Sequence, residues 1–541
     1  MTATKGDPWW RGAVIYQVYP RSFRDTGGDG IGDLPGITEK LEHIASLGVD
    51  ALWISPFFLS PMKDFGYDVA DYRQVDPMFG SNEDFDDLLA RAHDLGLKVM
   101  VDMVLCHTSD QHPFFAESRS SRDNDKADWY VWRDAKPDGN PPNNWLSVFG
   151  GPAWSWNHTR KQYYLHNFLS SQPALNWNNE EVVEAMLGEC RFWLDKGVDG
   201  LRLDAIPALV VDPELRDNPP LEDGDSIDVG GAPGSPFRMQ NHKYDRDLPH
   251  ILPLLERLRA LTDDYGDRFL LGEVGDVDSI PVSAKYSHGE DRLHSCYTFQ
   301  LLNALPTAPN LRKLIDRYAN EMNGGWPTLA FGNHDVERTV TRWAAHDHLT
   351  GDTAAVARLV LAVLVSIRGS VILYQGEELG LTEVDLPFEA IVDPYGLAFW
   401  PDYKGRDGSR TPMPWTSEGE ALGFSESTPW LPVGPDHAAL SVAAQDGTQG
   451  TTLHFAKALF AWRQERHAMR CGSLDCAPGP ETVLAFSREN DSETVLCVFN
   501  LSNAPAEWTA PEGWVPEEDA PQTGVVEGQL PPYGIAFFRR V

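Results

Sequence analysis

Strand-like and helix-like segments alternate along most of this sequence, and no other feature limits the possible folds so strongly. Eight short apolar runs have the length and composition of buried strands: residues 13–19, 49–55, 98–105, 198–204, 268–274, 295–302, 326–332 and 370–375. Long loops or segments with helical periodicity separate them, at residues 83–95, 181–196, 250–262, 311–323 and 353–367 and around Ile37, Leu41, Ile44 and Leu47. This order is typical of parallel β/α units. It predicts an α/β fold, the (β/α)8 or TIM barrel.

Two long segments interrupt this alternation, and the end of the chain departs from it. Residues 108–178, rich in Trp, Pro, Asn and Asp, separate the third strand from its helix, and segments of this length are usually functional. Residues 207–248 are rich in Pro, Gly and acids, and two interpretations are open: a mobile lid or a solvated surface loop. After a helix at 453–464, short alternating runs at 482–487, 494–500 and 534–539 predict an antiparallel β domain.

These interruptions divide the chain into three predicted parts. The catalytic barrel takes residues 1–107 and 179–468. An inserted subdomain after the third strand takes residues 108–178, and a C-terminal β domain takes residues 469–541.

The chain is strongly acidic, with 80 Asp and Glu against 45 Lys and Arg in 541 residues and a formal net charge of −35. Nucleic acids and anionic membranes are bound through basic surfaces, so we expect neither as a partner. A neutral or cationic small ligand is favoured instead. We expect a monomer or a homodimer.

The six cysteines show no spacing typical of a zinc site or a disulfide framework. Free thiols in a reducing compartment are expected, with a Cys471–Cys476 bridge as the alternative. The sequence begins without an apolar signal region, and no run has the length of a membrane span. These features predict a cytoplasmic protein.

Charged side chains occur in the apolar strand at 198–204. Arg202 and Asp204 lie two residues apart, on one side of that strand. Burying the pair is unfavourable unless the charges serve each other or a ligand. A structural ion pair inside a barrel is one interpretation, and an active site is the other.

Acids and histidines at the ends of other strands favour the active site. His107 follows the third strand, Glu273 ends the fifth, and His334 and Asp335 follow the seventh. Catalytic groups of such barrels lie at the C-terminal ends of the strands. Acids held close together shift one another's pKa apart, which separates an ionised nucleophile from a protonated acid. Glycoside hydrolysis needs this division of labour.

Several motifs identify the family that the chain resembles. They are YQVYPRSF (16–23), DMVLCH (102–107), QPALN (172–176), GLRLDA (200–205), GEV (272–274), FGNHD (331–335) and SRTPMPW (409–415). Together they resemble the alpha-amylase family of glycoside hydrolases, and more narrowly its alpha-glucosidase and oligo-1,6-glucosidase branch. The resemblance extends over nearly the whole chain. Because the motifs occur in the family's order, chance similarity is a poor explanation.

The resemblance implies roles for individual residues. Asp204 falls on the catalytic nucleophile, Glu273 on the general acid/base, and Asp335 on the acid that stabilises the transition state. Arg202, His107 and His334 fall on sugar-binding residues of the subsite for the nonreducing end. The family reaction retains anomeric configuration through a covalent glucosyl-enzyme, and the resemblance implies no organic cofactor.

A second set of residues implies action at chain ends. In exo-acting members an Asp after the second strand pairs with a downstream Arg and closes a pocket around the terminal glucose. Asp64 matches the Asp; Arg406 is the favoured partner and Arg410 the second choice. Tyr67 would stack on that glucose, and Phe149 would form a wall of the pocket. A salt bridge at the rim and ordinary core packing are the alternative interpretations.

Ala205, directly after the nucleophile position, bears on linkage. In this branch Val at this place accompanies alpha-1,6 preference, and Thr or Ala accompanies alpha-1,4 preference. One small residue changes selectivity by only about 1–3 kcal/mol. The resemblance thus implies an alpha-glucosidase for maltose-like alpha-1,4 glucosides, with transglucosylation to alcohols or sugars as a second activity. A sucrose- or trehalose-processing enzyme, an oligo-1,6-glucosidase and a non-catalytic transporter-associated relative are the alternatives.

The loop at residues 25–33 carries acids at alternating positions, and relatives hold calcium or magnesium here. Such oxygen-rich loops bind hard cations, so a structural Ca²⁺ or Mg²⁺ is expected. The implied ligands are Asp25, Asp29, Ile31 and Asp33. Gly27 stands where many relatives have Asn. Cys106 and Ala174 replace the Asn and Asp of a second calcium site, which this sequence is therefore not expected to form.

Overall fold

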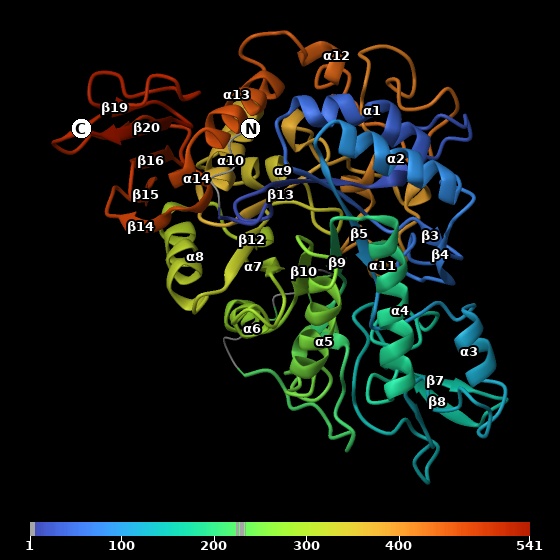
Figure 1. Cartoon of the computed structure of the whole chain (residues 1–541). Coiled ribbons are helices and arrows are strands. Elements are labelled where there is room, and N and C mark those ends of the chain that lie inside the picture. The colour runs from blue at the N-terminus through green and yellow to red at the C-terminus, as the bar shows by residue number, and fades with distance from the viewer. Residues whose placement is uncertain (1–5, 223–226, 228–231, 233) are drawn as a thin grey trace.

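The computed structural model describes residues 6–222, 227, 232 and 234–541. Eight parallel strands form a closed barrel in the order β1-β13-β12-β11-β10-β9-β5-β2, which confirms the predicted TIM barrel (Figure 1). The barrel strands are β1 Val14–Val18, β2 Ala51–Ile54, β5 Lys98–Met103, β9 Gly200–Leu203, β10 Phe269–Val274, β11 Ser295–Thr298, β12 Trp326–Leu329 and β13 Ser370–Tyr374. Their side chains are almost all buried on both faces, as is usual for parallel strands.

Helices surround the barrel, and several of them begin with a capping side chain. The longer ones are α1 Leu34–Ser46, α2 Asn82–Asp94, α4 Glu180–Lys196, α5 Ile251–Asp263, α6 Ser279–Tyr286, α8 Ala308–Glu321, α10 Thr353–Ser366 and α13 Thr452–Gln464. Short helices are α7 Phe299–Leu302, α9 Thr339–Ala344, α11 Pro394–Phe399, α12 Val442–Gln445 and α14 His467–Cys471. Ser81 and Asp84 form a capping box at the start of α2, and Gly197, with φ of 100°, ends α4 in the left-handed region.

The sixth strand is shorter than the predicted segment 295–302. It ends at Thr298, and Phe299–Leu302 forms α7 instead. The Thr298 hydroxyl accepts a hydrogen bond from the Gln300 amide and caps this turn. An apolar run of this kind does not by itself distinguish a strand from a buried helix, so the prediction was wrong at these four positions.

Strand register places the functional side chains next to each other. In the pairing of β5 with β9, Asp102 lies opposite Arg202. In the pairing of β10 with β11, Glu273 lies opposite Tyr297. Neighbours in register on a parallel sheet point to the same side, and here that side is the barrel interior.

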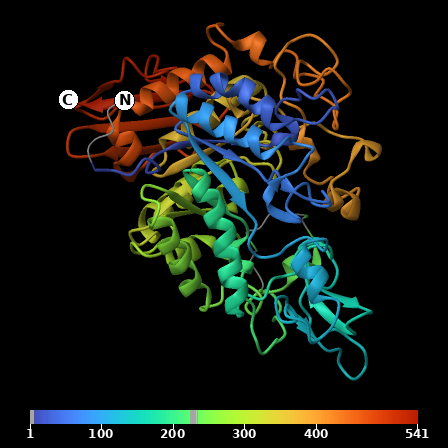
Figure 2. The same cartoon turned by 45° about the vertical axis from the view of Figure 1, so that its right-hand side comes forward.

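The predicted insertion after β5 forms small antiparallel structure. It contains α3 Pro113–Ser118 and a sheet of β6 Trp132–Arg133, β8 Gln162–Leu165 and β7 Trp154–Asn157. Aromatic side chains form its centre, where the rings of Phe115 and Trp132 stack. A hairpin of β3 Phe58–Leu59 and β4 Asp71–Val75 follows β2. The insertion and the C-terminal sheet lie at opposite ends of the molecule in both views (Figures 1 and 2).

For the segment 207–248 the sequence left two interpretations, a mobile lid and a solvated surface loop, and the structure bears on part of each. Its beginning is buried, from Pro207 to Asp212, and Phe237 belongs to a buried cluster, so these parts are not a solvated loop. The lid interpretation also falls on residues 223–226, 228–231 and 233, which lie outside the described residues.

The C-terminal region is an antiparallel β domain. Its main sheet has the order β14-β15-β16-β20-β18, and β17 pairs with β19. The strands are β14 Ser473–Ala477, β15 Val483–Glu489, β16 Thr494–Asn500, β17 Ala506–Glu507, β18 Trp514–Pro516, β19 Gln529–Leu530 and β20 Ile535–Arg540. The domain boundaries expected from the sequence, at 107/108, 178/179 and 468/469, stay a prediction. All six cysteines are free, so Cys471 and Cys476 form no bridge. Within the described residues, no helix is both long and apolar enough to cross a membrane.

Candidate active site

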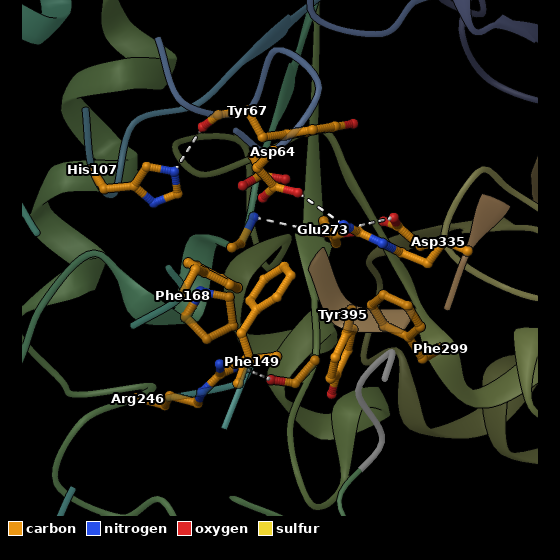
Figure 3. Close-up of a pocket in the computed structure, with 16 residues that line it drawn as sticks. Asp64, Tyr67, His107, Phe149, Phe168, Arg246, Glu273, Phe299, Asp335 and Tyr395 are labelled. Carbon is orange, nitrogen blue, oxygen red and sulfur yellow. Dashed lines mark hydrogen bonds and ion pairs between the residues drawn. The ribbon is translucent and has the colours of Figure 1, made fainter. Parts of the chain in front are cut away.

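The three predicted acids meet at one pocket. Asp204 directly follows β9, Glu273 lies near the end of β10, and Asp335 follows β12 by a short loop. All three line one pocket that opens to solvent (Figure 3). Its position, at the C-terminal ends of the strands, is that of the active site in barrels of this kind.

The guanidinium of Arg202 contacts two of these acids, Asp204 and Glu273. Its Nη1 lies 2.6 Å from Asp204 Oδ1 and 2.8 Å from Asp102 Oδ1, and Nη2 lies 2.6 Å from Glu273 Oε1. Arg202 is fully buried and does not line the pocket. A buried arginine and several buried acids are tolerable only as a network in which each charge is paired.

Burial dominates the protonation of the two acids that share Arg202. It raises the pKa of Glu273 to about 7, against the opposing charge of Arg202. It also raises the pKa of Asp204 to about 7, again with Arg202 opposing the shift. One positive charge thus serves three carboxyls, because burial also raises the pKa of Asp102, to about 6. Carboxyls that interact this closely share their protons.

Asp335 is held ionised by different partners. Burial would raise its pKa, but His334, Arg406 and Arg410 outweigh burial and hold the pKa of Asp335 well below its usual range. The guanidinium of Arg410 lies 2.9 Å from Asp335 Oδ1, and that of Arg406 lies 3.2 Å from the same oxygen. Asp335 is therefore anionic when Glu273 still carries a proton.

The pairing of Asp64 with Arg406 is the one that the sequence favoured. Arg406 Nη2 donates to Asp64 Oδ1 at 2.8 Å, and the same guanidinium also binds Asp393. Gln172 donates to the other Asp64 oxygen at 2.9 Å. Arg410, the second choice, instead donates to the His334 carbonyl and to Asp335 behind the pocket wall. Asp64 and Arg406 both line the pocket.

Aromatic and imidazole side chains also belong to the site. Tyr67 and His107 line the pocket, and His334 lies behind Tyr67 with the two rings parallel at 5.3 Å. The Tyr67 hydroxyl lies 2.7 Å from His334 Nε2, and His107 Nε2 lies 2.8 Å from the Tyr67 carbonyl. Burial lowers the pKa of His107 to about 4 and that of His334 to about 3, so both rings are neutral near pH 7. Phe149, from the insertion, also lines the pocket, with Arg406 5.3 Å from its ring centre.

The backbone at Ala205 is left-handed, with φ of 44° and ψ of 43°. Its amide donates to Glu273 Oε2 at 3.1 Å. This conformation is uncommon outside glycine and is poorly tolerated by β-branched residues. The turn therefore directs the Ala205 amide at Glu273 while Ala205 itself lines the pocket.

Several site residues were missed in the sequence. Asp102 lies within the motif DMVLCH, but nothing in the sequence indicates that it accepts a hydrogen bond from Arg202. Tyr297 lies in a strand without a charge at its end, and its hydroxyl donates to Glu273 Oε1 at 2.8 Å. Only the register of β10 with β11 reveals that contact. The other missed residues around the pocket are Val148, Phe168, Gln172, Pro207, Arg246, Gly275, Phe299, Asp393 and Tyr395.

The loop at 25–33 brings two of its three acids together. Asp25 Oδ1 and Asp33 Oδ2 both lie 3.7 Å from the point where a Cβ on Gly27 would stand. Both carboxylates accept backbone amide hydrogen bonds, and Asp29 turns to the amide of Ile31. In the part of the chain that the structure describes, the only group of three such ligands within reach of one ion is Asp7, His467 and Cys471. The loop therefore offers two converging carboxylates, a partial fit to a hard cation.

Comparisons with known proteins agree with this geometry. The family model described as "Alpha amylase, catalytic domain" matches residues 17–472, and that of the "Maltogenic Amylase, C-terminal domain" matches residues 476–536. A probable alpha-glucosidase of Rhizobium meliloti (strain 1021) is 52% identical over 92% of this chain and 90% of its own length. An oligo-1,6-glucosidase of Heyndrickxia coagulans is 36% identical over 93% of this chain and 94% of its own.

The chain is also similar over nearly its whole length to a solved structure. The crystal structure of the alpha-glucosyl transfer enzyme XgtA has a TM-score of 0.95 and 50% identity, over 99% of this chain and 100% of that chain. Barrel, insertion and C-terminal β domain are thus shared with proteins of one family. The chain belongs to the alpha-amylase family of glycoside hydrolases, in the branch of the alpha-glucosidases and oligo-1,6-glucosidases.

Proposed function

We propose that the protein is an exo-acting, retaining alpha-glucosidase that releases alpha-glucose from the nonreducing end of short alpha-glucosides. The observation that carries this proposal is the contact of Asp64 with Arg406 beside the three acids. A pocket that is closed at this end accepts a terminal glucose and excludes the interior of a chain. The relatives described as alpha-glucosidases support the same substrate class.

In the proposed reaction Asp204 attacks the anomeric carbon while Glu273 protonates the leaving oxygen. Glu273 then deprotonates a water that releases glucose from Asp204. The two carboxyls contact the two terminal nitrogens of one guanidinium, which supports the short spacing of retaining enzymes. Asp335, kept ionised by two arginines, would stabilise the positive charge that develops on the sugar ring.

Two finer features belong to the same proposal. The small side chain of Ala205 supports alpha-1,4 linkages such as that of maltose. Attack on the glucosyl-enzyme by an alcohol or a sugar instead of water would give transglucosylation, and the similarity to an alpha-glucosyl transfer enzyme supports this second activity. Phe299 and Tyr395, which also line the pocket, would shelter an apolar acceptor.

The test is a substrate series of maltose, isomaltose, sucrose, trehalose and starch, with released glucose and its anomer followed by NMR. We expect alpha-glucose from maltose, less from isomaltose and none from starch. Cleavage of starch would contradict the closed pocket. If the protein does not cleave maltose but acts on sucrose or trehalose, the three acids keep their roles and the protein is a sucrose- or trehalose-processing enzyme instead.

We further propose that the 25–33 loop holds a structural Ca²⁺ or Mg²⁺. Asp25 and Asp33 lie near one point, which supports such a site, and Asp29 would have to leave the Ile31 amide to join them. Calorimetric titration of chelator-treated protein with Ca²⁺ and with Mg²⁺ tests this, beside a D33N variant. An equal heat signal in both proteins would place the ion elsewhere.

A further inference from the structure

Arg246 is the charged side chain of the pocket that the proposed reaction does not use. It lies between the short helical turn at Pro236–Met239 and α5, and it is only 8% exposed. It lines the pocket together with Glu273 and Phe299. In Figure 3 it lies at the end of the pocket away from Asp64, with Phe168 between them. Because Asp64 closes the glucose end, Arg246 faces the aglycone side.

Arg246 lacks the partners that the other buried arginines of the site have. Within the described residues it makes one hydrogen bond, a long one of 3.4 Å from Nη1 to the Gly275 carbonyl, and its guanidinium lies 5.1 Å from the Phe237 ring centre. Among the described residues, no carboxylate forms an ion pair with it, whereas Arg202, Arg406 and Arg410 each contact one or more.

Two acids near Arg246 have other hydrogen-bond partners, although the charge of Arg246 opposes the rise that burial causes in the pKa of one of them, Asp276. Asp247 is taken by the Lys285 ammonium and by the Tyr286 hydroxyl, both at 2.6 Å. Asp276 accepts the amide of Val277 at 2.7 Å. A guanidinium has five N–H donors in a planar fork, so most of the hydrogen-bonding capacity of Arg246 is not used by the described residues.

The surroundings of Arg246 indicate the shape of a ligand. The outer pocket is otherwise lined by apolar and aromatic side chains such as Val148, Phe299 and Tyr395. Arg246 also lines a neighbouring surface hollow with Lys243, so a group bound at the guanidinium has a route toward solvent. An aromatic or aliphatic body would fill the apolar part, and its far end would meet the guanidinium.

We propose that Arg246 is a specificity residue of the aglycone site, and that this site favours an apolar alcohol or phenol that bears a carboxylate. A carboxylate matches the planar fork of the guanidinium through two parallel hydrogen bonds, and an anion best offsets a buried cation without a partner. The inference rests on the proposed alpha-glucosidase activity and extends it to the leaving group and the acceptor.

The test uses two aryl alpha-glucosides of nearly equal shape, 4-carboxyphenyl and 4-carbamoylphenyl. For each protein the kcat/KM of the carboxylate substrate is divided by that of the amide substrate. Dividing this ratio for the wild type by that for R246Q removes differences in intrinsic reactivity between the leaving groups. We expect this quotient to be about tenfold or more, because hydrogen bonds between charged groups are the strong ones.

Two further variants separate the fork from the general field. R246K keeps the charge and loses the fork, and we expect an intermediate quotient. K243Q removes a nearby exposed cation that does not line the pocket, and we expect its ratio to equal that of the wild type. The same ratio in wild type and R246Q overturns the proposal, as does an equal loss in K243Q and R246Q.

Hydrolysis of p-nitrophenyl alpha-glucoside distinguishes failure of this inference from failure of the proposed function. If that reporter is cleaved but neither test substrate is, the carboxylate aglycone is wrong and the alpha-glucosidase proposal stands. If the reporter is also inert, the proposed function itself fails.

Discussion

The Tyr297 hydroxyl donates a 2.8 Å hydrogen bond to Glu273 Oε1 from the neighbouring barrel strand. It also accepts a hydrogen bond of 2.7 Å from Arg202. The hydroxyl stabilises the carboxylate form of Glu273 and so opposes the rise in pKa that burial causes. Tyr297 thereby acts on the proposed acid/base through a hydrogen bond and serves as a positioning residue.

Replacement Y297F should raise the pKa of Glu273 further. We expect the alkaline limb of the pH profile of kcat/KM to move upward by about one unit, because a hydrogen bond to a charged group is lost. KM for maltose should change less than kcat. A lower rate with an unmoved alkaline limb would mean that Tyr297 contributes only to packing.

The wild-type pH profile should be a narrow bell centred near neutrality. Glu273 must be protonated for the first step, so activity is lost as the pH rises through its pKa of about 7. Asp204 must be ionised, so activity is lost as the pH falls through its pKa, also about 7. Because these carboxyls interact, the two limbs of the pH profile report apparent pKa values of the interacting group and not of Asp204 or Glu273 alone. Measurement of kcat/KM from about pH 4 to about pH 10 checks this, and a broad plateau across the acid side would contradict it.

Replacement D204N should abolish turnover while the protein stays folded. The amide is no nucleophile, and losses of at least about 10³-fold are usual for such changes. Activity on p-nitrophenyl alpha-glucoside measures the loss, and circular dichroism with thermal unfolding checks the fold. Retained turnover would remove Asp204 from the nucleophile role.

Replacement R406Q should lower both stability and substrate binding. It leaves the buried carboxylates of Asp64 and Asp393 without their cation, which typically costs about 3–5 kcal/mol of unfolding free energy. KM for maltose should rise as well, since the closed end of the pocket is lost. R317Q is the matched control: Arg317 binds two half-exposed acids, so we expect a change within about 1 kcal/mol. Equal unfolding midpoints for both variants would refute the argument.

Replacement A205V should shift linkage preference toward alpha-1,6. The extra methyl groups narrow the pocket beside Glu273, and the effect on the isomaltose to maltose ratio of kcat/KM should be about tenfold or less. Because a β-branched residue is strained at φ of 44°, the variant should also be less stable by about 1–2 kcal/mol. An unchanged ratio would show that linkage is decided elsewhere in the pocket.

Much of the fold could be predicted because local patterns determine it. Barrel strands are buried on both faces and therefore read as apolar runs, and helices such as Glu180–Lys196 carry their own end signals in Asn179 and Gly197. The error at Phe299–Leu302 shows the limit. A buried apolar segment has no periodicity that separates strand from helix, and the Thr298 cap decided the outcome.

The residues of the site also fall into two groups: those that a local sequence pattern indicates and those that only contacts in space reveal. The sequence by itself determined the three acids, because Asp204, Glu273 and Asp335 are charges at the ends of apolar strands, and burial of charge is conspicuous. It also indicated Asp64 with Arg406, through motifs far apart in the chain. What such a pattern shows is residue type and position within one element.

Only the tertiary structure decided which groups share a partner. The contact of Tyr297 with Glu273, the placement of Asp102 behind Arg202, and the second contact of Arg406, with Asp393, depend on register between strands and on loops that meet in space. The same holds for Arg246, whose lack of an ion pair is a property of everything around it. Charges act over a few ångströms in space whatever their separation along the chain, and for that reason their partners could not be predicted from the order of residues.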